Sequence, residues 1–144
     1  MSFIKNNMNK GIIPSNKVKD VKVFYFYRTE FNDDMDVEEL ISKAFSKIGD
    51  DEVFDIVKYT ANMWFGVSSK SLCCIYIDFD DEDMNCLEAV KFVDNKVWKL
   101  NAGYMYIDNN YQKIIITSAK PANELYKDNN RWKEKIKTFI SEKV

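Results

Sequence analysis

Six consecutive residues hold the densest chemistry in this sequence. The stretch DFDDED, residues 78–83, places five carboxylates directly after the apolar run SLCCIYI. Carboxylates at this density could bind a divalent cation, serve as general acid and base, attract a basic partner or begin a helix. The residue types around the stretch test each of these uses in turn.

A calcium-binding EF-hand loop does not fit the stretch. Such a loop needs glycine at its sixth position and a bidentate glutamate at its twelfth. A loop starting at Asp78 has Asp83 and Ala89 at those positions, and a loop starting at Asp81 fails in the same way. The sequence therefore predicts no metal site, and nothing in it indicates another cofactor.

Nucleophilic catalysis has little support, because the chain contains no histidine and only three cysteines, Cys73, Cys74 and Cys86. Without histidine, Ser-His-Asp and Cys-His catalysis are excluded, as are HExxH zinc sites. Cys73 and Cys74 lie inside an apolar strand, where a thiol is neutral and inert, and they point to opposite faces of that strand. We expect three free thiols with structural roles.

Other enzyme signatures are also missing. The chain has four glycines and contains neither a glycine-rich phosphate loop nor a GxSxG elbow. A carboxylate-dependent enzyme stays open as an alternative, but it would need two acids converging in a cleft, and adjacent acids at a strand end point mostly into water. We expect a protein that is not an enzyme.

A second alternative is a sheet-based binder of single-stranded nucleic acid. Bases could stack on aromatic residues of the predicted strands, namely Tyr25, Tyr27, Trp98, Tyr104, Tyr106 and Tyr111. Such a protein also needs a basic groove. The net charge is −2, only Arg28 and Arg131 are arginines, and the lysines are scattered apart from a C-terminal set that suits a solvated helix face. Nucleic acid is therefore a disfavoured partner.

The acidic stretch is best explained as a docking patch for a basic protein. Acidic clusters speed association with basic partners and can imitate phosphate groups. We expect an immunity or inhibitor protein that neutralises a cognate, nuclease-like toxin by occluding its active site. The predicted contacts are Asp78, Asp80, Asp81, Glu82 and Asp83, with Tyr76 as an exposed aromatic anchor. The competing explanation is that residues 80–83 only cap a helix and keep the strand end soluble.

Length and composition predict one globular domain. A chain of 144 residues that is 46% hydrophobic can bury a proper core. Residues 1–19 are polar and Asn-rich, so we predict a flexible arm there and a single α+β domain over residues 20–144. Because no segment has the apolar core of a signal peptide or the roughly 20 apolar residues of a membrane span, we expect a cytoplasmic protein with no membrane contact.

Two regions have helical spacing. Residues 36–48 carry an apolar stripe that begins after Asp36, a predicted N-cap, and stops at Gly49. A second apolar stripe runs through residues 121–142, and Pro121 is well tolerated in a first helical turn. Both helical regions need an apolar surface to pack on, which the strands between them supply.

The runs rich in β-branched and aromatic residues predict strands. Residues 21–27 suit a central strand, whereas residues 50–59 fit a strand only slightly better than a helix. The other runs predict a hairpin of 61–67 with 72–79 and a meander of 97–100, 104–107 and 113–117. We therefore predict an α+β domain in which helices 36–48 and 121–142 pack on an antiparallel sheet of about five or six strands. Strand order stays open, and an aromatic-rich sheet edge could form a homodimer.

Overall fold

The computed structural model describes residues 17–144. Residues 1–16 of the predicted arm therefore lie outside the described residues. The last part of that predicted arm contacts the domain. Val18 forms an isolated antiparallel bridge with Lys96, and the Lys19 N–H donates to the carbonyl oxygen of Asn95 at 2.6 Å. Lys19 is buried, so the body of the protein begins before residue 20.

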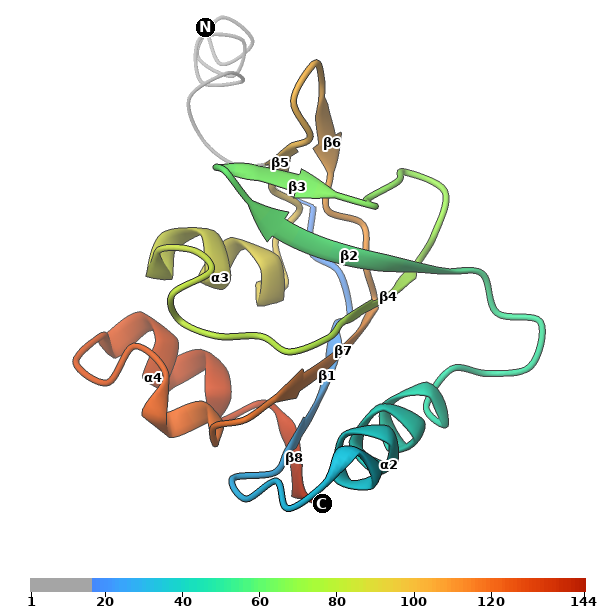
Figure 1. The fold of residues 1–144 in the computed structure, drawn as a ribbon. Coiled ribbons are helices and arrows are strands. Elements are labelled where there is room, and N and C mark those ends of the chain that lie inside the picture. The colour runs from blue at the N-terminus through green and yellow to red at the C-terminus, as the bar shows by residue number, and fades with distance from the viewer. Residues whose placement is uncertain (1–16) are drawn as a thin grey trace, which may run out of the picture.

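Within residues 17–144 the main sheet has six strands in the order β3-β2-β4-β7-β1-β8, and a separate hairpin joins β5 to β6 (Figure 1). The strands are β1 Lys22–Tyr27, β2 Phe54–Thr60, β3 Met63–Phe65, β4 Cys73–Tyr76, β5 Lys99–Asn101, β6 Tyr106–Asp108, β7 Lys113–Ser118 and β8 Ile140–Lys143. The helices are α2 Asp34–Phe45, α3 Cys86–Val93, α4 Asn130–Ile136 and the short 3₁₀ helix η1 Ala122–Glu124.

The main sheet is mixed and mostly parallel, so the prediction of an antiparallel sheet is wrong. In the described part of the chain, β1, β2, β4, β7 and β8 run parallel to their neighbours, and β3 alone runs antiparallel, against β2. Every residue of β4 and nearly all of β7 is buried. Continuous apolar strands of this kind are typical of parallel sheets that helices cover on both faces. The predicted α+β class and the strand number agree with the structure.

Two connections explain the error in strand direction. The strand β3 folds back on β2 through Ala61 and Asn62, whose φ angles of 52° and 63° make a two-residue hairpin loop. Residues 63–65 therefore pair with β2 and not with residues 73–76. After the β5–β6 hairpin, β7 enters the main sheet between β4 and β1 and does not complete the predicted meander.

Helices cover both faces of the sheet, with α2 on one side and α3 and α4 on the other (Figure 1). The path from β1 through α2 to β2 crosses the sheet in one direction, and the path from β4 through β7 to β8 crosses it in the opposite direction. Right-handed crossovers then place the helices on opposite faces. Cys73 packs in the core beneath α2 and Cys74 in the core beneath α3 and α4, which confirms that these two thiols face opposite ways.

The early helix is confirmed with shifted ends, since α2 spans 34–45 where 36–48 was predicted. Its N-cap is Asp33, whose side chain accepts from the Asp36 N–H at 3.2 Å, so the assignment of Asp36 as the cap is wrong.

The C-terminal region is helical only in part. Residues 122–124 and 130–136 are helical, but residues 140–143 form β8, which pairs parallel to β1. The turn before β8 is fixed by Phe139, whose ring packs against Tyr25 at 6.1 Å and Trp132 at 5.7 Å between centroids. Strand pairing satisfies the backbone groups along the outer side of β1, which a helix could not do.

Candidate functional site

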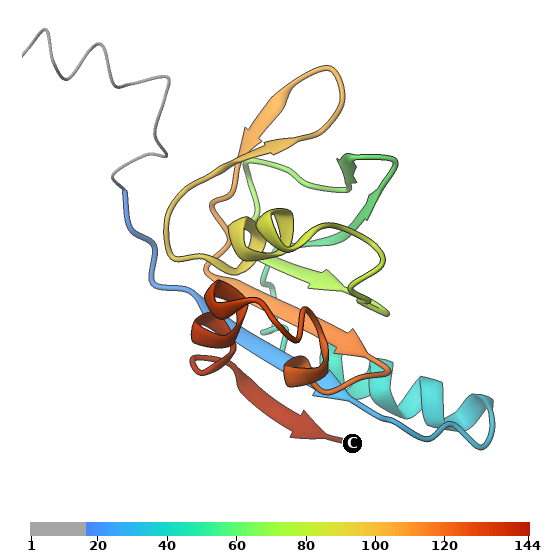
Figure 2. The same ribbon diagram turned by 90° about the vertical axis from the view of Figure 1, so that its left-hand side faces the viewer.

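The carboxyl ends of the parallel strands bring nine of the 23 acidic residues of the chain to one edge of the sheet. In Figure 2 the arrowheads of β1, β4, β7 and β8 all point to the same side of the molecule. We define the acidic edge as residues 28–36, 77–85 and 119–121, which follow β1, β4 and β7, together with residues 143–144 at the end of β8. It contains three cations, Arg28, Lys120 and Lys143, and nine carboxylates: Glu30, Asp33, Asp34, Asp36, Asp78, Asp80, Asp81, Glu82 and Asp83.

This edge also contains the point at which the chain reverses its direction across the sheet. The segment after β1 leads to α2 on one face, and the segment after β7 leads to α4 on the other. The two segments separate beside a backbone hydrogen bond, in which the Arg28 N–H donates to the Ser118 carbonyl oxygen at 3.2 Å. Ligands of open parallel sheets bind at such reversal points, outside the carboxyl ends of the strands.

Hydrogen bonds within the acidic turn, residues 78–83, fix its shape. One carboxylate oxygen of Asp83, Oδ2, accepts from the Asp80 N–H at 3.1 Å and from the Tyr76 hydroxyl at 2.9 Å. The Asp83 N–H in turn donates to the Asp80 carbonyl oxygen at 3.0 Å. The turn is also joined to β7, because the Asp78 N–H donates to the Thr117 hydroxyl oxygen at 2.9 Å. The acidic side chains are therefore presented from a rigid loop.

The acids of this turn do not cap the helix that follows. The N-cap of α3 is Asn85, whose side-chain oxygen accepts from the Glu88 N–H at 2.9 Å. Asp78 and Glu82 are exposed, and Asp80, Asp81 and Asp83 are partly exposed. The capping part of the competing explanation is therefore wrong, whereas its other part, that these acids keep the strand end soluble, stays a prediction, as does their contact with a partner.

Tyr76 is not an exposed anchor, because its side chain is only 1% exposed. Its ring packs in the core against Phe79 at 5.0 Å and against Trp64 at 6.2 Å between centroids. Its hydroxyl accepts from the Tyr59 N–H at 3.3 Å and donates to Asp83. Every residue of β4 is buried, so an aromatic side chain in this strand supports the acidic turn from within.

Lys120 is the cation that lies against the acidic turn. Its Nζ is 3.1 Å from Asp80 Oδ1 and 3.6 Å from Asp81 Oδ1. Partial burial acts to raise the pKa of Asp80, but hydrogen bonds from Lys120 and Asp81 outweigh it and hold that pKa below its usual value. The same contact with Asp80 raises the pKa of Lys120. Because both side chains are substantially exposed, the pair contributes little to folding stability.

The acids that follow β1 were not predicted as part of the site. Glu30, Asp33 and Asp34 are exposed and lie on the same edge as residues 78–83. In the sequence they are typical of the start of a helix, where acids stabilise the first turn. Only the parallel direction of β1 and β4 shows that the two acidic segments share an edge.

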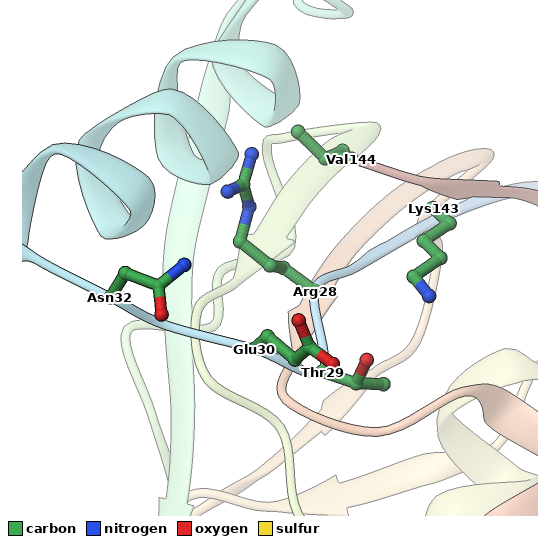
Figure 3. Close-up of a pocket in the computed structure, with 6 residues that line it drawn as sticks. All are labelled: Arg28, Thr29, Glu30, Asn32, Lys143 and Val144. Carbon is green, nitrogen blue, oxygen red and sulfur yellow. The ribbon is translucent and has the colours of Figure 1, made fainter.

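A shallow hollow of about 140 Å³ lies at the carboxyl ends of β1 and β8 (Figure 3). It is lined by Arg28, Thr29, Glu30, Asn32, Lys143 and Val144. The Arg28 guanidinium points toward α2, where it donates to Asp36 at 2.6 Å and to Glu39 at 3.0 Å. These contacts neutralise the only arginine of the acidic edge, so its charge does not offset the nearby exposed acids.

Other kinds of site find less support in the described residues. Residues 17–144 contain no group of three or more acidic or cysteine side chains placed to hold a metal ion. In the same range no helix has the length and apolarity to cross a bilayer. Tyr25 and Tyr111 are buried, and helices cover both sheet faces, so these rings do not form an open stacking surface. Tyr104 and Tyr106 are exposed, but they lie on the β5–β6 hairpin.

Comparisons with known proteins assign no family to the chain. No protein-family model and no curated protein sequence matches it. The geometry of the acidic edge is therefore the basis on which its function is argued.

Proposed function

We propose that this protein binds and inhibits a basic protein partner through the acidic edge. The observation that supports it is that two acidic segments, residues 30–36 and 78–83, follow β1 and β4 at the same edge of the sheet. The acidic edge holds nine carboxylates against three cations, whereas the whole chain has a net charge of only −2, so the excess of negative charge lies at this edge. A concentrated field of one sign accelerates association with an oppositely charged surface and disfavours partners of the same sign.

The rigidity of the acidic turn also supports a binding role. Asp83 bonds to the backbone of the turn and to buried Tyr76, which leaves Asp78 and Glu82 in solvent on a fixed loop. Residues held in place before association lose little conformational entropy on binding. An inhibitor needs only such a complementary surface and no catalytic group.

The partner that fits best is a nuclease-like toxin acting in the same cytoplasm. Enzymes that bind nucleic acid carry cationic grooves for phosphate, and surface carboxylates can occupy those grooves in place of phosphate oxygens. The cytoplasm also suits the three free cysteines, because reducing compartments keep thiols unpaired.

The test is a matched pair of charge-reversal variants used as bait in affinity capture. Asp81→Lys with Glu82→Lys alters the acidic turn and spares Asp83, which fixes its shape. Asp50→Lys with Glu134→Lys changes the net charge by the same amount at exposed positions outside the acidic edge. We expect the wild-type protein and the Asp50/Glu134 variant to capture the same basic protein and to inhibit its nuclease activity.

The Asp81/Glu82 variant should associate with the purified partner at least about tenfold more slowly at low ionic strength, with the difference shrinking as salt is added. Equal association rates for the two variants would refute the role of the acidic edge. A captured protein whose activity is unchanged in the complex would refute inhibition.

A further inference from the structure

One face of the main sheet is covered by a helix only in part. On this face α2 contacts β1 and β7, and at its end Phe45 meets Phe54 of β2 with ring centroids 6.0 Å apart. Within residues 17–144, no helix lies on that side of the rest of β2 or of β3 (Figure 1). The opposite face of these strands is covered by α3, since Trp64 of β3 packs against Phe92 at 4.7 Å between centroids. Parallel sheets usually have helices over both faces, so the region that α2 leaves uncovered is unusual.

The uncovered region presents apolar side chains to solvent. We define the open face as the exposed side chains of β2 and β3 on the α2 side: Phe54, Ile56, Lys58, Thr60 and Phe65. Their side of the sheet follows from the pairing of Ile56 with Ile75, which lies in the core beneath α2. Ile56 is 56% exposed and Phe65 is 48% exposed, whereas Val57 points to the other face and is buried. Neighbouring exposed apolar side chains of this kind mark an interaction surface.

Charges of opposite sign lie at the two ends of the open face. Lys58 is exposed toward the end of β2, and Asp51 is exposed in the loop that precedes β2. Neither side chain forms an ion pair within residues 17–144, whereas the neighbouring Glu52 is held by Lys113 at 2.8 Å. The side chains of β2 that lie between the two charges on this side are apolar. Reversing the direction of the strand exchanges the acidic end for the basic end, so the face is complementary to an antiparallel copy of itself.

We propose that the open face binds a second copy of this chain in a two-fold symmetric dimer. The two-fold axis passes between Phe54 and Ile56, so that β2 of one protomer lies over β2 of its partner and runs in the opposite direction. Two sheets packed in this way are about 10 Å apart and enclose the apolar side chains of their facing surfaces. Phe54 of each protomer then contacts Ile56 of the other, and Lys58 of each lies near Asp51 of the other.

A second copy fits the open face better than nucleic acid or a basic protein does. The open face contains one charged side chain, Lys58, so it has no field of one sign that would attract a highly charged partner. Homodimer interfaces are more apolar than the rest of a protein surface, and their centres are depleted of charge. None of the residues of the open face belongs to the acidic edge, so the dimer is independent of the proposed partner.

The first test is sedimentation velocity of the full chain at protein concentrations from about 1 μM to about 100 μM. We expect a dimer that dissociates on dilution, and a monomer at every concentration would overturn the proposal and show that the face has a different occupant. Ile56→Glu puts a charge at the centre of the interface and should raise the dimer Kd at least about tenfold. Leu87→Glu is the matched control, because Leu87 is 48% exposed on α3, away from the open face, and its replacement should leave Kd unchanged. Equal effects of the two variants would place the dimer contact elsewhere and refute the open face.

The second test asks whether Asp51 faces Lys58 across the two-fold axis. Asp51→Asn suits it, because asparagine tolerates the left-handed backbone of this residue, whose φ is 61°. In the wild-type protein Asp51→Asn removes an attraction and should raise the dimer Kd. In a Lys58→Glu background the same substitution removes a repulsion and should lower the dimer Kd. A change of the same sign in both backgrounds would refute the antiparallel arrangement, and circular dichroism checks that each variant is folded.

Discussion

The Asp83 side chain determines whether the acidic turn keeps its shape. It accepts from the Asp80 N–H and from the hydroxyl of Tyr76, which is buried in the core. Replacing Asp83 with alanine leaves that hydroxyl without its carboxylate acceptor, and an unsatisfied buried polar group costs about 1–3 kcal/mol. We therefore expect Asp83→Ala to lower the free energy of unfolding by about 1–3 kcal/mol, measured by urea denaturation.

The matched control for this residue is Glu82→Ala. Glu82 is exposed and lies next to Asp83 in the same turn, so its removal should change the unfolding free energy by less than about 0.5 kcal/mol. Comparable losses for the two variants would show that Asp83 acts through its charge and not through its hydrogen bonds.

Among the elements, the β2–β3 hairpin depends on one glycine. Gly66 has a φ of +81°, and a Cβ placed on it would lie 2.0 Å from the carbonyl oxygen of Ile56 in β2. Since the obstructing atom belongs to the backbone of a paired strand, the clash cannot be relieved by rotating a side chain. We expect Gly66→Ala to destabilise the fold by at least about 2 kcal/mol in thermal or urea unfolding.

Gly49, which follows α2, supplies the control for that substitution. An added Cβ there would meet the flexible Glu52 carboxylate at 3.0 Å, and its φ is not in the left-handed region. Gly49→Ala should therefore cost less than about 1 kcal/mol. If Gly66→Ala lowers the free energy of unfolding less than Gly49→Ala does, the backbone strain expected at Gly66 is contradicted.

The elements themselves were largely predictable, whereas their pairing was not. The apolar stripe of residues 36–48 predicts α2 because periodicity is a local property. The direction of β7 relative to its neighbours depends on its pairing with β4 and β1, which lie far earlier in the chain. An apolar run such as IIIT has the same pattern whether the strand is parallel or antiparallel. The continuous burial of β4 and β7 was the available sign of a parallel sheet, since antiparallel strands usually alternate.

At the scale of the whole molecule, the candidate site was only half visible in the sequence. Residues 78–83 are conspicuous because their acids are consecutive, but Glu30, Asp33 and Asp34 join them only through the parallel topology. The burial of Lys19 likewise depends on the folded chain around it and has no signature in the sequence. Sequence analysis finds clusters that are continuous along the chain and misses those that the fold assembles.

The charge pairs of the molecule predict how its stability depends on pH. The pKa values of Glu52 and Asp94 lie below their usual values in the folded state: a hydrogen bond from Lys113 is the largest effect on Glu52, and bonds from Lys135 and Trp98 outweigh burial at Asp94. A lowered folded pKa stabilises the protein above the unfolded pKa of about 4, and this stability is lost as pH falls through the folded pKa. With no histidine to titrate, the urea midpoint should stay flat between about pH 5 and pH 7 and fall below about pH 4.

Lys113→Met tests why stability is lost at low pH, because it removes the ammonium group that lies 2.8 Å from Glu52 Oε2. The drop in unfolding free energy between about pH 5 and pH 3 should be smaller in this variant than in the wild-type protein, since Glu52 would then titrate closer to its unfolded pKa. Lys22→Met, at an exposed position of β1, should keep the full drop. If the drop in unfolding free energy is unchanged in Lys113→Met, the acid sensitivity belongs to the other paired carboxylates. A change in the urea midpoint of the wild-type protein between about pH 6 and pH 7 would contradict the prediction made from the lack of histidine.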